Sequence, residues 1–241
     1  MRNLPALAAT IALVGTVLIW PAAGSAELPV PAGESVQGRI EGAALVSVPR
    51  PPARKGTVPL TRWAHKARGA LWTRAAMVAL RTHGRPLTEM VPDDIGQWCP
   101  AYATADQRQR AAFWVGLMSA LAKYESTYKA AAVGGNGRWY GLLQILPATA
   151  RGYRCAATTG QALRSGGANL SCAVRILAHT VPRDGVVHGR NGRWLGVSAD
   201  WGPMRVDSKR REMTAWLRDQ PYCQSESSLR PRLRPFDLTQ K

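Results

Sequence analysis

Acidic residues are scarce in this chain of 241 residues: 15 Asp and Glu stand against 32 Lys and Arg, for a formal net charge of +17 at pH 7. The basic residues are spread through the chain, and such an excess favours polyanionic partners through long-range attraction. Inside a cell that partner would be nucleic acid, whereas an exported protein meets the carboxylates of the cell wall or an anionic membrane surface. The charge also promotes solubility, so by itself it identifies no partner.

Several signatures of metal sites and catalytic sites are missing. The four cysteines form no Cys-x-x-Cys, and the four histidines lie at no ligand spacing beside them, which argues against a metal site. The chain has no Gly-x-Ser-x-Gly elbow and no Gly-x-x-x-x-Gly-Lys phosphate loop. The glycine-rich stretch 134–137 follows no strand and opens no helix, so we expect a flexible loop there. We therefore expect neither a metal nor a cofactor.

One long hydrophobic run is present, at the amino terminus. It extends from Leu4 to Trp20 after Arg2, and small residues ending at Ala26 follow it. This pattern predicts an export signal over residues 1–26 that is cleaved after Ala26. A retained membrane anchor is the alternative, although the run is short for a span and includes Pro5. No cysteine follows the small residues, which excludes a lipid anchor at that point.

All four cysteines lie beyond the predicted signal. An even number of cysteines in an exported chain indicates two disulfides, and three pairings are possible. We favour Cys155–Cys172, which closes a short loop, and Cys99–Cys223, which joins the front of the domain to its end. Each would add about 2–4 kcal/mol to the free energy of unfolding.

The remaining chain divides by composition into three parts. Residues 27–61 are rich in Pro, Gly and Val and predict an extended linker, residues 62–223 predict one domain, and residues 224–241 predict a basic, disordered tail. Alternating strand patterns are scarce, so we expect an all-α domain or one with minor β structure. The predicted helices cover residues 70–81, 92–98, 106–124, 147–153, 169–179, 193–199 and 210–218.

An unusually placed carboxylate, Glu125, stands at the carboxyl end of the third of these helices. A capping-box pattern at Thr104 and Gln107 predicts the start of this helix. Its apolar face is defined by Trp114, Leu117, Met118 and Leu121, with Gly116, Ser119 and Lys123 on the opposite side. Glu125 falls on the apolar face and near the carboxyl end of the helix, and both effects raise the pKa of a carboxyl group. A general acid needs such a pKa, although an ion pair with Lys123, Arg138 or Arg151 is the structural alternative.

Glu125-Ser126, followed after a glycine-rich turn by Gly141-Leu142-Leu143-Gln144-Ile145, resembles the active-site core of the soluble lytic murein transglycosylases. The resemblance covers about residues 112–203, where Asn169-Leu170 looks like the family helix behind the site. It implies a mainly α, goose-type-lysozyme-like domain with at most a small β-hairpin, stapled by the disulfides.

The resemblance also implies the chemistry. Enzymes of this family cleave the glycan of peptidoglycan with one glutamate, which acts as acid and then as base and closes a 1,6-anhydro ring without water. By motif match Glu125 takes both roles, while Ser126 and Gln144 order the site and bind substrate. The alternatives are a helix-end hydroxyl for Ser126, a turn residue that caps the next helix for Gln144, and a core position for each of the motif's aliphatic residues.

The chain departs from the family at a turn whose tyrosine touches the glutamate. Aligning Gly202-Pro203 puts Ala199 at the tyrosine position and Asp200 at the neighbouring asparagine. Either Trp201, Tyr140 or another aromatic residue replaces the ring, or the alignment does not hold at this turn. Asp200 is also the main candidate for a second acid. The repeat Asn136-Gly137-Arg138-Trp139 and Asn191-Gly192-Arg193-Trp194 predicts two tight turns, each able to present a Trp such as Trp139 at a groove edge; chance recurrence is the alternative.

Taken together, these patterns predict an exported lytic transglycosylase of the periplasm or cell exterior that acts on the MurNAc–GlcNAc bond of peptidoglycan. We expect glycan strands as partners, no nucleic acid, and no membrane span after signal cleavage. A hydrolytic lysozyme with a second acid, and a peptidoglycan-binding protein without turnover, are the rival interpretations.

Overall fold

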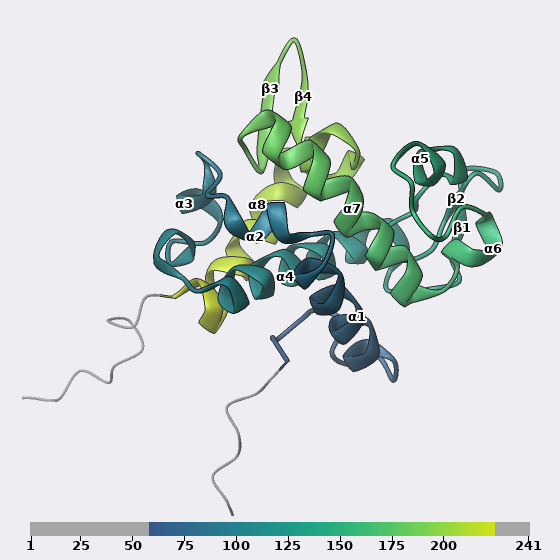
Figure 1. Ribbon diagram of the computed structural model, residues 1–241, viewed down its shortest axis with the longest axis horizontal. Helices are drawn as coiled ribbons and strands as arrows, with labels where there is room; N and C mark the ends of the chain where they lie inside the picture. Colours follow the sequence, from purple (N-terminus) through teal and green to yellow (C-terminus); the bar gives the residue numbers. More distant parts are fainter. Residues whose placement is uncertain (1–57, 225–241) are drawn as a thin grey trace, which may run out of the picture. The chain divides into compact units, whose positions relative to one another are not determined.

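The computed structural model describes residues 58–224, and the predicted signal peptide, most of the linker and nearly all of the tail lie outside them. The described part is mainly helical (Figure 1), as expected. Its α-helices are α1 Gly69–Arg81, α2 Arg85–Glu89, α3 Ile95–Trp98, α4 Gln107–Ser126, α5 Pro147–Gly152, α6 Gly160–Leu163, α7 Gly166–Asp184 and α8 Asp207–Arg218. Short 3₁₀-helices are η1 Tyr102–Thr104, η2 Val197–Ala199, η3 Gly202–Arg205 and η4 Pro221–Cys223.

Helix α4 is the central element, packed against α1, α2, α8 and η4. The sequence pattern assigned it a polar side, but that side is buried too. Gly116 lies where any β-carbon would collide with the Tyr222 hydroxyl. The Ser119 hydroxyl donates to the Gly116 carbonyl and accepts from the Arg62 amide. Residues 111–122 are all buried, so the middle of α4 is enclosed on every side, and Lys123 near its end stays partly exposed.

The start of α4 corrects a sequence prediction. Asp106, and not Thr104, caps the helix: its carboxylate accepts from the Gln109 amide at 2.7 Å, and the Gln109 side chain accepts from the Asp106 amide. Thr104 belongs to the preceding η1 and donates to the Ala101 carbonyl. Both candidates fit the capping-box spacing, and the chain extends at Asp106, the geometry that an N-cap needs.

Helix α7 connects two regions that hold the strands. It begins after α6, beside β1 Val133–Gly134 and β2 Trp139–Tyr140, and ends before β3 His188–Asn191, as Figure 1 shows. The helix continues through Pro182 to Asp184, five residues past the predicted end at residue 179. Pro182 supplies no amide for the Ala178 carbonyl, and the helix stops two residues later, where Gly185 takes a positive φ of 73°.

The helix predicted over residues 193–199 is wrong. Strand β3 pairs antiparallel with β4 Arg193–Gly196 around Gly192, whose φ is +64°, and η2 follows directly. The Asn-Gly turn signal therefore outweighs the short helical pattern. A second small hairpin, β1–β2, occupies the predicted glycine-rich loop, with Val133 opposite Tyr140.

Two disulfides close the domain, and they are the pairs favoured from the sequence. Cys99–Cys223 joins residues 124 apart, and Cys155–Cys172 joins residues 17 apart. The first ties the segment before α4 to the end of the domain, and the second attaches the loop after α5 to α7. Disulfides of this kind persist in oxidising compartments.

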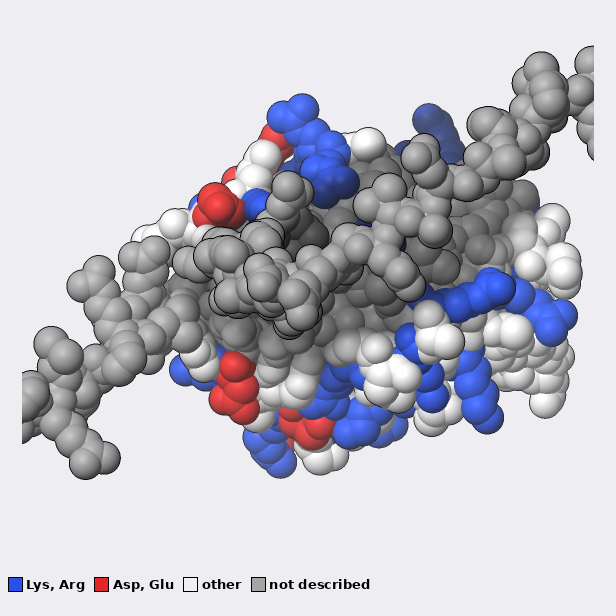
Figure 2. Space-filling model, turned by 90° about the horizontal axis from the view of Figure 1, so that it is seen from below, with Lys and Arg blue, Asp and Glu red and all other residues white. Residues whose placement is uncertain are grey.

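The surface is basic, and the helices are short or polar. Figure 2 shows one face, on which Lys and Arg outnumber the acidic side chains. Within residues 58–224 no helix is both long enough and apolar enough to cross a membrane.

Candidate active site

Glu125 lies in the last turn of α4, one residue before the helix ends. Beyond the helix, Thr127 and Tyr128 both adopt positive φ, 50° and 62°, which is rare for residues other than glycine. Hydrogen bonds hold this bend: the Tyr128 amide donates back to the Ala122 carbonyl, and the Lys129 amide to the Ser126 carbonyl. The glutamate therefore sits where a rigid helix meets a tightly folded loop.

The Glu125 carboxyl group is partly buried and forms neither a hydrogen bond nor an ion pair within residues 58–224. Burial raises its pKa from 4.5 to about 7, and the positive charge of Lys209 on α8 opposes part of this rise. At neutral pH a large fraction of such a group is protonated and can donate a proton.

The three basic residues considered as ion-pair partners of Glu125 are engaged elsewhere. Lys123 Nζ bonds Glu212 at 3.1 Å, Arg138 lies over the Trp139 ring, and Arg151 donates to the Thr158 carbonyl. None of these contacts supports the alternative that Glu125 serves as the partner in a structural ion pair.

A network centred on Glu212 of α8 binds the two residues that precede Glu125 in α4. Its carboxylate accepts from Arg62 at 2.6 and 2.9 Å, from Lys123 at 3.1 Å and from the Tyr124 hydroxyl at 2.7 Å. Burial alone would raise the pKa of Glu212, but these hydrogen bonds outweigh it and lower the pKa to about 2. The network fixes α8, and with it Lys209, against the end of α4.

The Gly141–Ile145 segment is held by Asn169 of α7, which is fully buried. The Asn169 amide nitrogen donates to the carbonyls of Tyr140 and Leu163, and its oxygen accepts from the Leu143 amide at 2.9 Å. Gly141 has a φ of +82°, and a β-carbon there would lie 2.2 Å from the Leu163 carbonyl oxygen. The motif therefore needs glycine at position 141. Its aliphatic residues are buried in the core: Leu142, Leu143 and Ile145.

Gln144 ties this segment to the loop that follows Glu125. Its side-chain nitrogen donates to the Gly141 carbonyl at 2.9 Å and to the Ala132 carbonyl at 3.5 Å, while its backbone takes a φ of +46°. It does not cap α5, which begins at Pro147 without a side-chain cap. The Gln144 side-chain oxygen lies against Gly134 and has no hydrogen-bond partner within the described part of the chain.

Two residues assigned to substrate by the motif comparison point into the protein. The Ser126 hydroxyl is buried and donates to the Ala122 carbonyl, four residues earlier in the helix. Trp201 is also buried, and its ring nitrogen donates to the Leu143 carbonyl at 3.0 Å. These contacts favour structural roles: Ser126 completes the helix end, and Trp201 anchors the segment after η2 to the Gly141–Ile145 segment.

Both copies of the Asn-Gly-Arg-Trp repeat form hairpin turns, as the tight-turn prediction requires. In the first, Trp139 is 40% exposed with Arg138 over its ring, and the Tyr140 hydroxyl donates to the Gly137 carbonyl. In the second, Arg190 lies 4.9 Å from the Trp194 ring centroid. Trp139 is thus the exposed aromatic residue among the predicted contacts.

Asp200 belongs to a different electrostatic environment from Glu125. Partial desolvation raises the pKa of this surface carboxyl to about 6, while Arg183 and Arg205 oppose the rise. The pKa of Asp200 is thus set by burial and by these arginines, whereas the pKa of Glu125 is set by burial and by Lys209. Ala199, at the position of the family tyrosine, contributes its carbonyl to Arg205, and no tyrosine hydroxyl in the described residues bonds Glu125.

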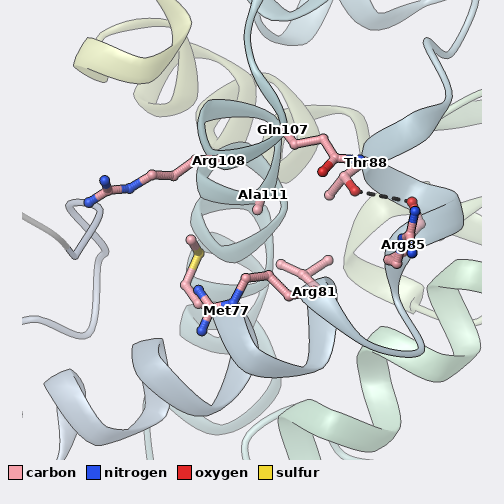
Figure 3. Close-up of a pocket in the computed structure, with 8 residues that line it drawn as sticks. Met77, Arg81, Arg85, Thr88, Gln107, Arg108 and Ala111 are labelled. Carbon is pink, nitrogen blue, oxygen red and sulfur yellow. Dashed lines mark hydrogen bonds between the residues drawn. The ribbon is translucent and has the colours of Figure 1, made fainter.

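A hollow between α1, α2 and the start of α4 lies far from this glutamate (Figure 3). It includes Gln107, the first residue of α4, so that about 27 Å of helix separates it from Glu125. Its arginines do not converge: Arg108 points away from the others, and Arg85 is paired with Glu89. This hollow is therefore distinct from the candidate active site.

Sequence reasoning missed three residues that organise the site: Lys209, Glu212 and the side-chain role of Asn169. A buried asparagine inside an apolar helix pattern is a signal that could have identified the last, because such an amide must be hydrogen-bonded. In the sequence, Lys209 and Glu212 belong to a segment with the pattern of an ordinary surface helix. Only the docking of α8 on α4 brings them to the end of α4 that holds Glu125.

Comparisons with known proteins agree with this geometry. Residues 103–194 match the family model described as the transglycosylase SLT domain, a stretch that includes Glu125, Gln144 and Asn169. No curated protein sequence matches the chain. Among solved structures, wild-type DslA (Bd0314) is 28% identical with a TM-score of 0.64, over 70% of this chain and all of that one.

Two glutamate-to-glutamine mutants of DslA are also similar, at 29% and 28% identity, each with a TM-score of 0.63 over 69% of this chain and 98% of theirs. The matched family model and these structures cover the same helical domain that holds Glu125. Residues 103–194 of the chain therefore match the transglycosylase SLT domain, and the described domain resembles the DslA structures in fold.

Proposed function

We propose that the protein is an exported lytic transglycosylase that cleaves the β-1,4 bond between MurNAc and GlcNAc in peptidoglycan. The observation that carries the proposal is Glu125, an unpartnered carboxyl whose pKa is raised to about 7 within an SLT domain. Glycosidic cleavage requires a proton donor at the leaving oxygen, and an acid with this pKa is suited to that role near neutral pH.

The reaction needs one carboxyl group and no water. Glu125 donates its proton to the glycosidic oxygen while the bond from that oxygen to the muramoyl C1 breaks. The resulting carboxylate then removes the proton from the C6 hydroxyl of the same muramoyl sugar, whose oxygen bonds to C1. Glu125 ends protonated, and the products are a 1,6-anhydro-MurNAc end and a free GlcNAc hydroxyl. The half-buried position of the glutamate suits both steps, since the two protonation states lie close in free energy.

The surroundings of Glu125 favour this route over hydrolysis with two carboxylates. An inverting or retaining hydrolase places its second carboxyl group roughly 5–9.5 Å from the acid. Within residues 58–224 no carboxyl group is hydrogen-bonded to Glu125, Glu212 is saturated by hydrogen bonds, and Arg183 and Arg205 act on Asp200. A hydrolytic muramidase remains the second candidate, because two of the similar DslA structures are mutants at two different glutamates.

We further propose that substrate lies along the loops beside Glu125. Gln144 offers an unused side-chain oxygen, and the exposed ring of Trp139 is suited to stacking on a sugar. We propose Tyr140 and Asp200 as further contacts to substrate. The export signal over residues 1–26 accords with the two disulfides, which favour an oxidising location such as the periplasm or the cell exterior.

Digestion of purified peptidoglycan tests the proposal. The mature protein and Glu125→Gln are incubated with sacculi, and the soluble products are identified by mass spectrometry. We expect anhydro-muropeptides from the wild type and none from the variant. Because Glu125 makes no hydrogen bond in the described residues, the variant should keep its helical circular dichroism. Reducing-end products would instead indicate a hydrolase, and co-sedimentation without soluble products would indicate a binding protein.

A further inference from the structure

Lys209 is a free cation beside the candidate general acid. It lies on the first turn of α8, partly buried, and its ammonium group is 5.3 Å from the ring centroid of Tyr124, the residue before Glu125. Within the described residues this ammonium group has no hydrogen bond and no ion pair. A cation at this place favours the ionised form of Glu125, which works against proton donation.

The carboxylate on the same side of α8 cannot neutralise Lys209. Glu212 is three residues further along the helix, and a carboxylate has about four acceptor positions. Four donors already occupy them: two nitrogens of Arg62, the Lys123 ammonium and the Tyr124 hydroxyl. The two lysines next to Tyr124 therefore differ. Lys123, also 5.3 Å from that ring centroid, is paired, and Lys209 is left for an external anion.

The substrate of the proposed reaction carries anions of one kind close to the cleaved bond. Each muramoyl sugar bears a lactyl group that ends in a carboxylate or in a stem peptide, and the peptide bears carboxylates of its own. We propose that Lys209 binds a carboxylate of the muramoyl substituent and makes the enzyme selective for strands that carry it. The inference rests on the proposed function, because it takes the glycan strand as the ligand of Glu125.

Binding at Lys209 would also couple substrate recognition to acidity. A bound carboxylate neutralises the ammonium group, which removes the charge that lowers the pKa of Glu125. The acid would therefore hold its proton more firmly once the correct strand is in place. A lysine that only tuned Glu125 would act equally on every strand.

The experiment compares three substrates and three proteins. The substrates are intact peptidoglycan, peptidoglycan freed of stem peptides by an amidase so that lactyl carboxylates remain, and peptidoglycan whose carboxylates have been amidated chemically. The proteins are the mature wild type, Lys209→Gln and the control Arg108→Gln. The control removes one positive charge at the exposed far end of α4, about 25 Å from Glu125.

We expect Lys209→Gln to lower kcat/KM about tenfold on strands with carboxylates and less than twofold on amidated strands, since a charge-assisted hydrogen bond is lost only in the first case. Lys209→Arg should restore most of the activity. A loss on intact strands alone assigns the carboxylate to the stem peptide, a loss on amidase-treated strands alone assigns it to the lactyl group, and a loss on both shows that Lys209 accepts either carboxylate.

Equal losses on all three substrates, with a shifted pH profile, would overturn the inference and leave Lys209 as a residue that acts only through Glu125. Unchanged rates on all three would overturn it as well. Sedimentation with the same three materials in a Glu125→Gln background gives a readout that needs no turnover. If the wild type cleaves nothing, this binding comparison still decides the role of Lys209, so that failure of the proposed function is recognised separately.

Discussion

At the scale of single residues, Glu125 destabilises the domain that it serves. Folding raises the pKa of the Glu125 carboxyl from its ordinary value of 4.5 to about 7. The carboxyl group therefore ionises more readily in the unfolded chain than in the folded one. The resulting loss in the free energy of unfolding is absent below about pH 4.5, grows as the pH rises to about 7, and is constant above that pH. It amounts to at most about 3 kcal/mol, reduced by the partial exposure of the group.

Glu125→Gln should therefore be more stable than the wild type at pH 8, with a Tm higher by about 3–6 °C, and equally stable at pH 4. Thermal unfolding followed by circular dichroism at both pH values measures this difference. Glu89→Gln is the control, because Glu89 forms only an exposed pair with Arg85. A Glu125→Gln protein that melts at or below the wild-type temperature at pH 8 would show that the carboxyl has a stabilising partner.

The direction of the Glu125 pKa shift was predictable from sequence, because it depends on the position of the residue in its own helix. Its surroundings were not. Lys209 and Glu212 are more than 80 positions away, and nothing in their local pattern marks them. Likewise, Ser126 and Trp201 match or adjoin family motifs, yet the direction of a side chain depends on tertiary packing, and both turn inward.

At the scale of elements, the Glu212 network docks α8 on α4. The pKa of Glu212 is lowered to about 2, so the network contributes stability above about pH 4.5 and loses it as pH falls towards 2. Glu212→Gln should be less stable than the wild type at pH 6, and the two proteins should converge near pH 2. Urea unfolding at the two pH values measures the change, and a constant difference would mean that the charge of Glu212 is not what matters.

Long helices with a clear pattern were predictable, and so was the short α5, whose start is marked by Pro147. Helices α1, α4 and α8 lie close to their predicted ranges, whereas α2 and α6 span five and four residues and leave little periodicity to detect. The segment 193–199 has apolar residues at spacings that suit either structure. Its Asn-Gly turn and the positive φ of Gly192 select the hairpin.

At the scale of the whole molecule, the two disulfides should contribute unequally. By loop-closure entropy, the Cys99–Cys223 bridge should stabilise the fold by about 5 kcal/mol and the Cys155–Cys172 bridge by about 3 kcal/mol. Paired Cys→Ala variants of each bridge, compared by urea unfolding, measure the two contributions. A larger loss from the Cys155–Cys172 pair would show that local packing beside α7 outweighs loop length.

The central claim is that Glu125 cleaves the glycan alone, without water as a reactant. Digestion of peptidoglycan in oxygen-18-labelled water tests it most directly, because hydrolysis places a labelled oxygen on the muramoyl C1 and ring closure does not. We predict anhydro products free of label from the wild type and no products from Glu125→Gln. Labelled reducing ends from the wild type would contradict the account and require a second acid or base beside Glu125.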